Sequence, residues 1–166
     1  EVLALDKHSG EILWERTAHT AIPIDHANAT PATDGKHVVA FFGSEGLYCY
    51  DTEGTLLWSK DLGPLEAGPY NAPNLEWGFA TSPIIHDGTV VIQCDVLNDS
   101  FLALFDVETG EEIWRKPRNE DATWSTPSVY GSGADKAIVV NGYKHIGAYR
   151  FDNGEEIWRM SGGGDI

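Results

Sequence analysis

The sequence has few basic residues, few sulfur-containing residues and no long apolar segments. Its 166 residues include 11 lysine and arginine residues against 26 aspartate and glutamate residues, which gives a formal net charge of −15. Nucleic acid and anionic membrane surfaces repel such a chain, so neither is expected as a partner. No apolar run reaches about 18 residues, so no membrane span is expected. An acidic coat that keeps the protein soluble explains the charge better than a basic partner does, but both interpretations stay open.

The sequence patterns of common catalytic and metal sites are missing too. The six histidines show no paired spacing of the kind that zinc sites use, and no glycine-rich phosphate loop leads from a strand into a helix. No segment has a convincing helical period. Two acidic pairs, Glu111-Glu112 and Glu155-Glu156, follow equivalent turns. A solvated strand edge explains them better than paired catalytic carboxylates.

One motif is present four times. The first copy, at 6–14, reads DKHSGEILW, and the third copy, at 106–114, reads DVETGEEIW. The aspartate can accept hydrogen bonds from the backbone amides that follow it, and the glycine can take a positive φ, so each copy predicts a hairpin turn. The tryptophan always stands four residues after the glycine. The four pairs are Gly10 and Trp14, Gly54 and Trp58, Gly110 and Trp114, and Gly154 and Trp158.

Apolar strands flank each copy of the motif. A short apolar run precedes each aspartate, and the third and fourth residues after each glycine are both apolar, so these strands are expected to be covered on both faces. A proline can begin a strand without losing a ladder hydrogen bond. A Thr-Pro or Ser-Pro dipeptide begins the other half of each unit. These dipeptides are Thr30-Pro31, Ser82-Pro83 and Thr126-Pro127. Each full unit therefore holds four antiparallel strands.

The predicted fold is all-β, a β-propeller of four-stranded antiparallel blades. The tryptophans lie 44, 56 and 44 positions apart, which is the period of a propeller blade with one insertion. We interpret residues 1–166 as a fragment of a single propeller holding about three and a half blades, which cannot close a ring alone. The half blade is expected at 1–17, and the full blades at 30–59, 81–115 and 125–159.

The repeat Ala-Leu-Asp-x-x-x-Gly-x-x-x-Trp, followed by Ser/Thr-Pro, resembles that of the pyrroloquinoline-quinone (PQQ)-type propellers. That family includes quinoprotein alcohol dehydrogenases and the outer-membrane assembly lipoprotein of the β-barrel insertion machinery. The resemblance covers essentially the whole chain and implies a periplasmic or extracellular location. It also implies that the four repeated tryptophans dock between neighbouring blades. Enzymes and non-enzymes share this scaffold, so the repeat alone does not assign a function.

The cysteines bear on the choice between these two classes. PQQ dehydrogenases of the family typically place a disulfide between adjacent cysteines against the cofactor, whereas Cys49 and Cys94 stand 45 positions apart and no Cys-Cys pair occurs. Both cysteines fall in apolar strands, where a buried thiol behaves as a small hydrophobe. A bridge between blades is the alternative, if geometry permits it. This departure from the family pattern weakens the enzyme interpretation.

The loops that lead into the innermost strands are the expected place for a binding site. They span 18–29, 59–80 and 116–125, and the middle one holds an insertion rich in proline, glycine and asparagine. A quinone would need an aromatic plane, and a calcium ion would need Asn or Asp oxygens. The candidate cofactor-binding residues are Trp77, Trp124, Asn28 and Asp121. Each also has a plain structural alternative, in closing a turn or covering the core.

Two functional hypotheses follow. The favoured one is a non-catalytic binding or scaffold propeller that holds a protein partner, or a small molecule, on its loop face or at a blade edge. No catalytic residue, metal site or cofactor is evident in the sequence. The alternative is part of a PQQ- and calcium-dependent dehydrogenase that oxidises alcohols or sugars, for which the resemblance implies both cofactors in the parent protein.

Overall fold

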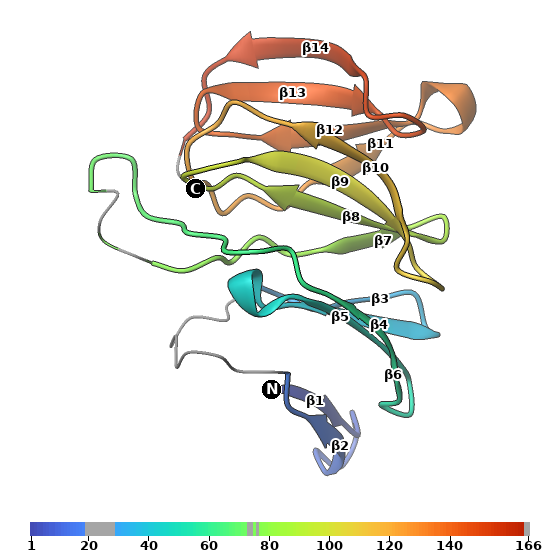
Figure 1. Ribbon diagram of the computed structural model, residues 1–166. Helices are drawn as coiled ribbons and strands as arrows, with labels where there is room; N and C mark the ends of the chain where they lie inside the picture. Colours follow the sequence, from blue (N-terminus) through green and yellow to red (C-terminus); the bar gives the residue numbers. More distant parts are fainter. Residues whose placement is uncertain (19–28, 73–74, 76, 165–166) are drawn as a thin grey trace.

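The computed structural model describes residues 1–18, 29–72, 75 and 77–164, which form one two-stranded and three four-stranded antiparallel sheets (Figure 1). The first sheet consists of β1 (Val2–Leu5) and β2 (Ile12–Arg16). The second consists of β3 (Ala32–Thr33), β4 (His37–Phe41), β5 (Leu47–Asp51) and β6 (Leu56–Lys60). The third consists of β7 (Ile84–His86), β8 (Thr89–Cys94), β9 (Phe101–Asp106) and β10 (Glu112–Pro117). The fourth consists of β11 (Ser128–Tyr130), β12 (Ala137–Asn141), β13 (His145–Arg150) and β14 (Glu156–Ser161).

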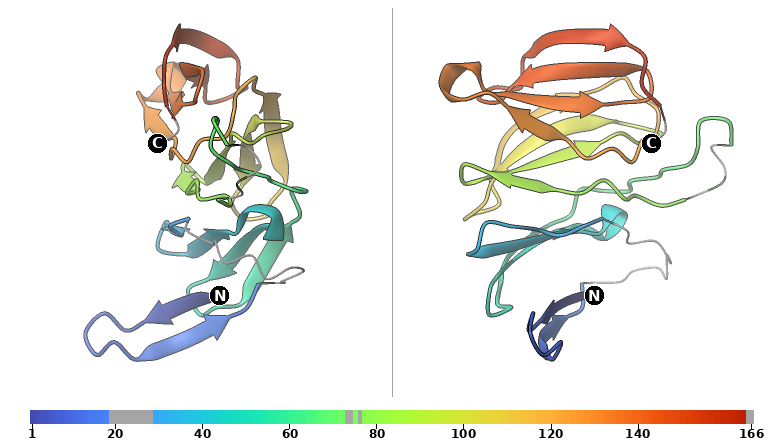
Figure 2. Two further views of the ribbon diagram at one scale, coloured as in Figure 1. Left: turned by 90° about the vertical axis from the view of Figure 1, so that its left-hand side faces the viewer. Right: turned by 180° about the vertical axis from the view of Figure 1, so that it is seen from behind.

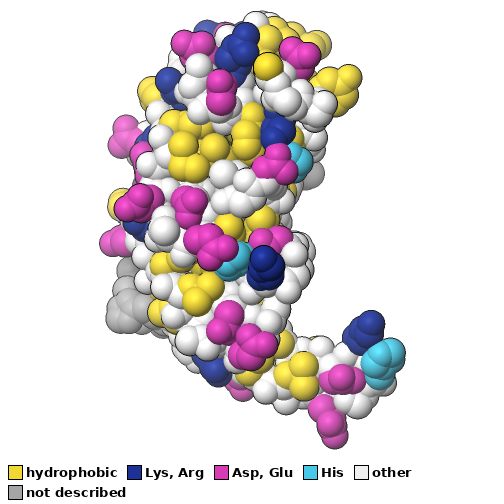
Figure 3. All heavy atoms as spheres, turned by 90° about the vertical axis from the view of Figure 1, so that its right-hand side faces the viewer, with side chains coloured by type: hydrophobic (Ala, Val, Ile, Leu, Met, Phe, Trp, Pro, Cys, Tyr) yellow, Lys and Arg dark blue, Asp and Glu magenta, His cyan; other side chains and the backbone are white. Residues whose placement is uncertain are grey.

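The sheets follow one another in a curved stack, and the fold class is the predicted one, an incomplete β-propeller of four-stranded blades (Figure 2). Strands that are neighbours in the sequence are neighbours in each sheet, so the chain runs up and down through every blade. The connections β4–β5, β6–β7, β8–β9, β10–β11 and β12–β13 therefore lie at one end of the stack, which we call the loop face. The tight turns within β3–β4, β5–β6 and the equivalent pairs form the opposite hairpin face, along which acidic side chains are spread (Figure 3).

The core lies between the sheets, because the inner strands bury both of their faces. In β8, Val90 and Ile92 pack against the second sheet, whereas Val91 belongs to the cluster shared with the fourth sheet. Adjacent residues of a strand point to opposite faces, so an uninterrupted apolar run serves two interfaces at once. The prediction of two covered faces, made for the strands beside each motif, is correct for β9, where Phe101, Ala103 and Phe105 join one cluster and Leu102 and Leu104 the other. It is wrong for β1, where Leu3 and Leu5 are exposed.

Three of the repeated tryptophans reach across to the next sheet. The indole Nε1 of Trp14 donates to the carbonyl oxygen of Thr52 at 2.8 Å, that of Trp58 to Val107 at 2.8 Å, and that of Trp114 to Phe151 at 3.0 Å. Each acceptor carbonyl lies in the outer turn of the following sheet. The rings therefore tie each sheet to its neighbour near the hairpin face.

The repeated glycines make room for these rings. A Cβ atom at Gly110 would lie 2.6 Å from Cδ2 of Trp58, and one at Gly54 would lie 2.7 Å from Cδ2 of Trp14. Gly154 faces Trp114 in the same way, at 2.7 Å. Gly10 has the same backbone conformation, with φ of +75°, but faces open space. At the turns that contact a tryptophan, glycine is therefore required for two reasons: its φ is positive, and the indole ring leaves no room for a Cβ atom.

The outer strands depart from the prediction that both of their faces are covered. The residue before each tryptophan is skipped in the strand register, so each outer strand contains a β-bulge. The extra residue lies unpaired, which breaks the strict alternation on which the prediction rested. These four residues are exposed, at 64% for Leu13, 45% for Leu57, 49% for Ile113 and 49% for Ile157.

The fourth turn also differs from the expected pattern. Asp6, Asp51 and Asp106 each accept hydrogen bonds from backbone amides two to four residues ahead. In the fourth repeat, Arg150 holds the equivalent place, since its carbonyl accepts the amide of Gly154. The side chain of Asn153, rather than that of an aspartate, accepts the amide of Glu155 at 2.9 Å.

We predict that Gly110→Ala destabilises the chain far more than Gly10→Ala, its matched control. A positive φ costs alanine about 1 kcal/mol at either position. Only at Gly110 does the new methyl group meet Trp58, and overpacking adds about 1–3 kcal/mol there. Urea unfolding of the 166-residue chain, followed by tryptophan fluorescence, measures both losses. Equal losses in the two variants would show that the indole contact does not constrain this position.

Candidate functional site

The insertion between β6 and β7 is fixed on the loop face by backbone contacts. The amide of Leu65 donates to Oγ of Ser44 at 2.7 Å, and the carbonyl of Glu66 accepts the amide of Leu97 at 3.0 Å. The two limbs of the insertion meet where the amide of Trp77 donates to the carbonyl of Ala67, also at 3.0 Å. Leu65 and Ala67 are buried. The described part of the insertion is therefore packed against the sheets.

Two aromatic pairs join the insertion to the β10–β11 and β12–β13 connections. The rings of Trp77 and Trp124 lie 5.5 Å apart with an angle of 41° between their planes, and Tyr70 stacks on Tyr143 at 4.5 Å and 23°. The indole of Trp124 also donates to the carbonyl of Gly78 at 2.8 Å. Trp77 and Tyr70 remain 47% and 56% exposed. We call these four residues the aromatic patch.

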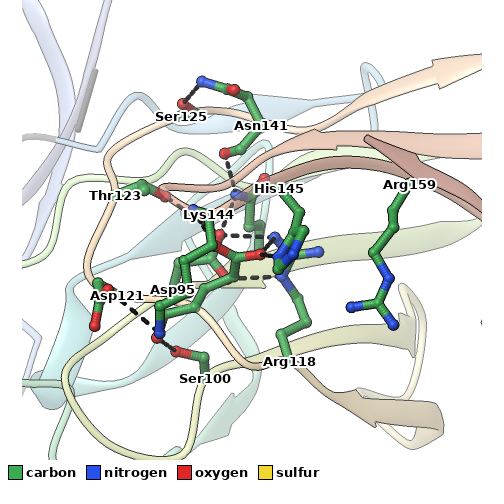
Figure 4. A network of polar contacts seen from close by, with 12 residues as sticks. Asp95, Ser100, Arg118, Asp121, Thr123, Ser125, Asn141, Lys144, His145 and Arg159 are labelled. Atoms are coloured by element: carbon green, nitrogen blue, oxygen red, sulfur yellow. Dashed lines mark hydrogen bonds and ion pairs between the residues drawn. The ribbon is translucent and has the colours of Figure 1, made fainter. Parts of the chain in front are cut away.

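A buried ion pair supports the connections that carry the patch (Figure 4). Arg118 donates from Nε to Oδ1 of Asp95 at 2.7 Å and from Nη2 to Oδ2 at 3.0 Å, and the two side chains are only 2% and 0% exposed. Nη1 of Arg118 donates to the hydroxyl of Tyr149 at 2.8 Å. Burial disfavours the charge of Arg118, but the hydrogen bonds and negative charge of Asp95 outweigh it and raise the pKa of the guanidinium.

Glu120 extends this network to the β12–β13 connection. Its carboxylate accepts the backbone amide of Lys144 at 2.7 Å, lies 3.1 Å from Nδ1 of His145, and is 3.7 Å from Nη2 of Arg118. A Cβ atom at Gly142 would lie 2.6 Å from both Arg118 and Glu120, so glycine lets the backbone pass close to them. The network thereby fixes the three connections β8–β9, β10–β11 and β12–β13 relative to one another.

Gln93, near the end of β8, also belongs to the network. Its Nε2 donates to Oδ2 of Asp95 at 2.7 Å and to the carbonyl of Asn141 at 2.8 Å. Thr123 donates its hydroxyl to the same Asp95 oxygen at 3.2 Å. Within the described residues, Oε1 of Gln93 is the buried side-chain oxygen that lacks a hydrogen-bond partner.

Of the residues that the sequence suggested for a cofactor, the structure brings Trp77 and Trp124 together. Asp121 lies in the same connection as Trp124, and its Oδ2 is 3.3 Å from Nζ of Lys144. Asn28 lies outside the described residues. Sequence reasoning missed Tyr70, Tyr143 and the Asp95–Arg118 pair. Only the position of these residues in or beside loop-face connections could have pointed to them.

The described donors do not fit a quinone with a calcium ion. Such a site needs an aromatic plane beside several converging oxygen ligands. Trp77 rests at an angle on Trp124, and the carboxylate of Asp121 faces the ammonium of Lys144. Across the described ranges, no group of three or more His, Cys, Asp or Glu side chains is placed to hold a metal ion.

Both cysteines are free and buried. Burial, together with the nearby carboxylates of Asp34 and Glu108, raises the pKa of Cys49 to about 12. Burial also raises the pKa of Cys94 well above its ordinary value. The interblade bridge that the sequence left open is therefore not formed, and neither thiol is activated.

The fold and the loop face define the class of the protein. It is a repeat propeller with exposed aromatic residues in the connections of its loop face. The sequence model of the family described as outer membrane protein assembly factor BamB matches residues 1–163, and the chain belongs to this PQQ-like repeat family. No curated protein sequence matches the chain significantly. No helix in the described ranges has the length and apolarity needed to span a bilayer.

Solved structures share the fold at low sequence identity. The quinohemoprotein alcohol dehydrogenase from Comamonas testosteroni superposes with a TM-score of 0.71 at 16% identity, over 98% of this chain and 32% of its own length. A europium-containing methanol dehydrogenase gives 0.65 at 13% identity, over 94% of this chain and 37% of its own. A protein of unknown function from Bacteroides caccae gives 0.61 at 13% identity, over 98% and 54%. The chain thus spans about a third of the length of the two dehydrogenases.

We predict that Arg118→Met destabilises the chain by about 3–5 kcal/mol, because it leaves the carboxylate of Asp95 buried without its partner. Arg159→Met is the matched control, since Arg159 is 53% exposed and pairs with Glu156 at the surface. Removing a surface pair costs less than about 1 kcal/mol. Chemical unfolding measures both changes. If the two variants lost similar stability, the buried pair would not be what holds the loop-face connections.

We also expect Cys49 and Cys94 to resist thiol reagents in the folded protein, because both thiols are buried and protonated at neutral pH. Reaction with a chromogenic disulfide reagent should release no colour in buffer and two equivalents in denaturant. Rapid labelling without denaturant would contradict the packing of the second and third sheets.

Proposed function

We propose that the chain forms part of a non-catalytic propeller that binds a protein partner on its loop face. Three lines of support converge. The family is described as an outer membrane protein assembly factor. The loop face carries exposed aromatic rings, and the described residues there offer no metal-ligand set. By the same family relation we propose that the protein works in the periplasm.

The observation that carries this proposal is the exposure of Tyr70 and Trp77 despite their fixed positions. Each ring is about half exposed, yet Tyr70 stacks on Tyr143 and Trp77 lies at an angle against Trp124, so each has a partner ring from another connection. Tyrosine and tryptophan are the residues that most often supply binding energy in protein interfaces. Rings that are already held lose little conformational freedom when a partner covers them. Leu75, which is 55% exposed, adds apolar area in the same insertion.

The rest of the fold explains why the patch lies on the loop face. At the hairpin face, the outer turns are occupied by the tryptophans of the preceding sheets. Residues there can change only if those contacts are kept. These tryptophan contacts lie at the hairpin face, so an insertion at the loop face can be accepted without disturbing them.

The test places a photo-crosslinking residue at position 77 of the full chain in its native cell. Position 130 is the matched control, because Tyr130 is 75% exposed but ends β11 toward the hairpin face. We expect a discrete crosslinked protein from position 77 and none from position 130. With the captured partner purified, Trp77→Ala should weaken binding about 30-fold or more, as for an interface hot spot of about 2 kcal/mol, while Tyr130→Ala should not change it.

Two outcomes would overturn the proposal. One is equal crosslinking from both positions, which would mean that contact is not confined to the loop face. The other is saturable quenching of tryptophan fluorescence by PQQ and calcium together with dye reduction by the full chain. That result would make the chain part of a dehydrogenase and establish the alternative hypothesis.

A further inference from the structure

A small pocket lies between the start of the insertion and the β8–β9 connection. Its volume is about 290 Å³. Leu62, Leu65 and Phe101 give it an apolar floor, and Glu66 and Asp99 stand at its rim. This volume is at the lower end of the range for ligand sites, about 300–1,000 Å³, so the pocket suits one long side chain rather than a cofactor.

The floor and walls of the pocket are held by the fold itself. Leu65 and Phe101 are 4% and 5% exposed, so its floor is part of the packed core. The hydrogen bond between Glu66 and Leu97 ties its two walls together. A ligand would therefore enter without a rearrangement of the backbone, which lowers the cost of binding.

The charge of the pocket is negative. Its one cationic wall residue, Arg115, is already paired, because its Nη2 lies 2.8 Å from Oε2 of Glu112 and its guanidinium lies 4.0 Å from the centroid of the Phe101 ring. Within the described part of the chain, the carboxylates of Glu66 and Asp99 have neither an ion pair nor a side-chain hydrogen bond. Two uncompensated carboxylates above an apolar floor match a side chain with an apolar stem and a cationic end.

We propose that this pocket receives an arginine side chain of the protein partner. The methylene groups of the arginine pack on Leu62 and Pro64, the more accessible apolar residues of the lining, and its guanidinium binds the carboxylates of Glu66 and Asp99. This inference rests on the proposed function, since Glu66 lies four residues before Tyr70 on the same insertion. A partner segment that covers the aromatic patch would thus place a neighbouring arginine in the pocket.

The first test uses Nα-acetyl-arginine amide as the probe, with its citrulline counterpart as the uncharged control. Both are titrated into the full chain while NMR follows the methyl signals of Leu62 and Leu65. We expect saturable shifts with the arginine probe and none with citrulline. Glu66→Gln and Asp99→Asn should each weaken the probe about threefold, as for partly exposed charge pairs. Glu111→Gln, which removes a charge from an outer turn, should have no effect.

Asparagine tolerates the positive φ of Asp99, which is 59°, and the side chain of Glu66 is exposed. Both variants should therefore keep the native spectrum, which separates lost binding from lost structure. Equal shifts with citrulline would refute the charge recognition. Shifts with Nα-acetyl-glutamate amide at the same methyl groups would show that Arg115 governs the pocket, and would also refute the proposal.

The two proposals fail in different ways. If the arginine probe does not bind but position 77 still crosslinks a partner, the pocket inference is wrong and the loop-face function stands. If the probe binds as expected but no partner is captured at position 77, the function is wrong although the pocket recognises arginine. If both hold, Glu66→Gln with Asp99→Asn should weaken the captured partner as well, by about tenfold when the two effects add.

Discussion

The whole architecture depends on the contact between a tryptophan ring and the glycine turn of the next sheet. The rings of Trp14, Trp58 and Trp114 each donate a hydrogen bond to a turn carbonyl and fill the space that a side chain at the glycine would occupy. The β-bulge just before the tryptophan adds an unpaired residue to the outer strand, beside the point where the ring leaves it. Without this contact the apolar residues between neighbouring sheets would lose a directional constraint near the hairpin face, because the hydrophobic effect is not directional.

The sequence could predict this part of the fold because its signals are local. Glycine and tryptophan stand four residues apart, and the apolar runs of β8 and β9 show that both faces are buried. The burial of the outer strands was harder to predict. A bulge adds one residue and interrupts the alternation of buried and exposed positions on which such a prediction depends. Arg150 could not be recognised as the equivalent of Asp106 for a related reason. The turn in the fourth repeat keeps its backbone hydrogen bonds but replaces the side chain that marked it.

The candidate site could be predicted only in part. The length of the insertion and the two tryptophans pointed to the loop face, but Asp95, Arg118 and Glu120 stand on different connections and carry no periodic pattern. Their pairing depends on how the third and fourth sheets stack, which sequence spacing does not contain. The same applies to Tyr70 and Tyr143, whose rings are 73 positions apart in the sequence and 4.5 Å apart in space.

The buried network is better understood as a positioning device than as a source of stability. Replacing a buried ion pair by apolar residues of similar size is often neutral or favourable, so its presence is weak evidence for a stabilising role. Its geometric effect is clear, however, because Arg118 and Glu120 join the three connections that hold Trp124, Tyr143 and the Asp99 wall of the pocket. An aromatic surface that is already in place loses less conformational entropy when a partner binds. Under the proposed function, the carboxylates of Glu66 and Asp99 would select the charge of the partner segment that covers the rings.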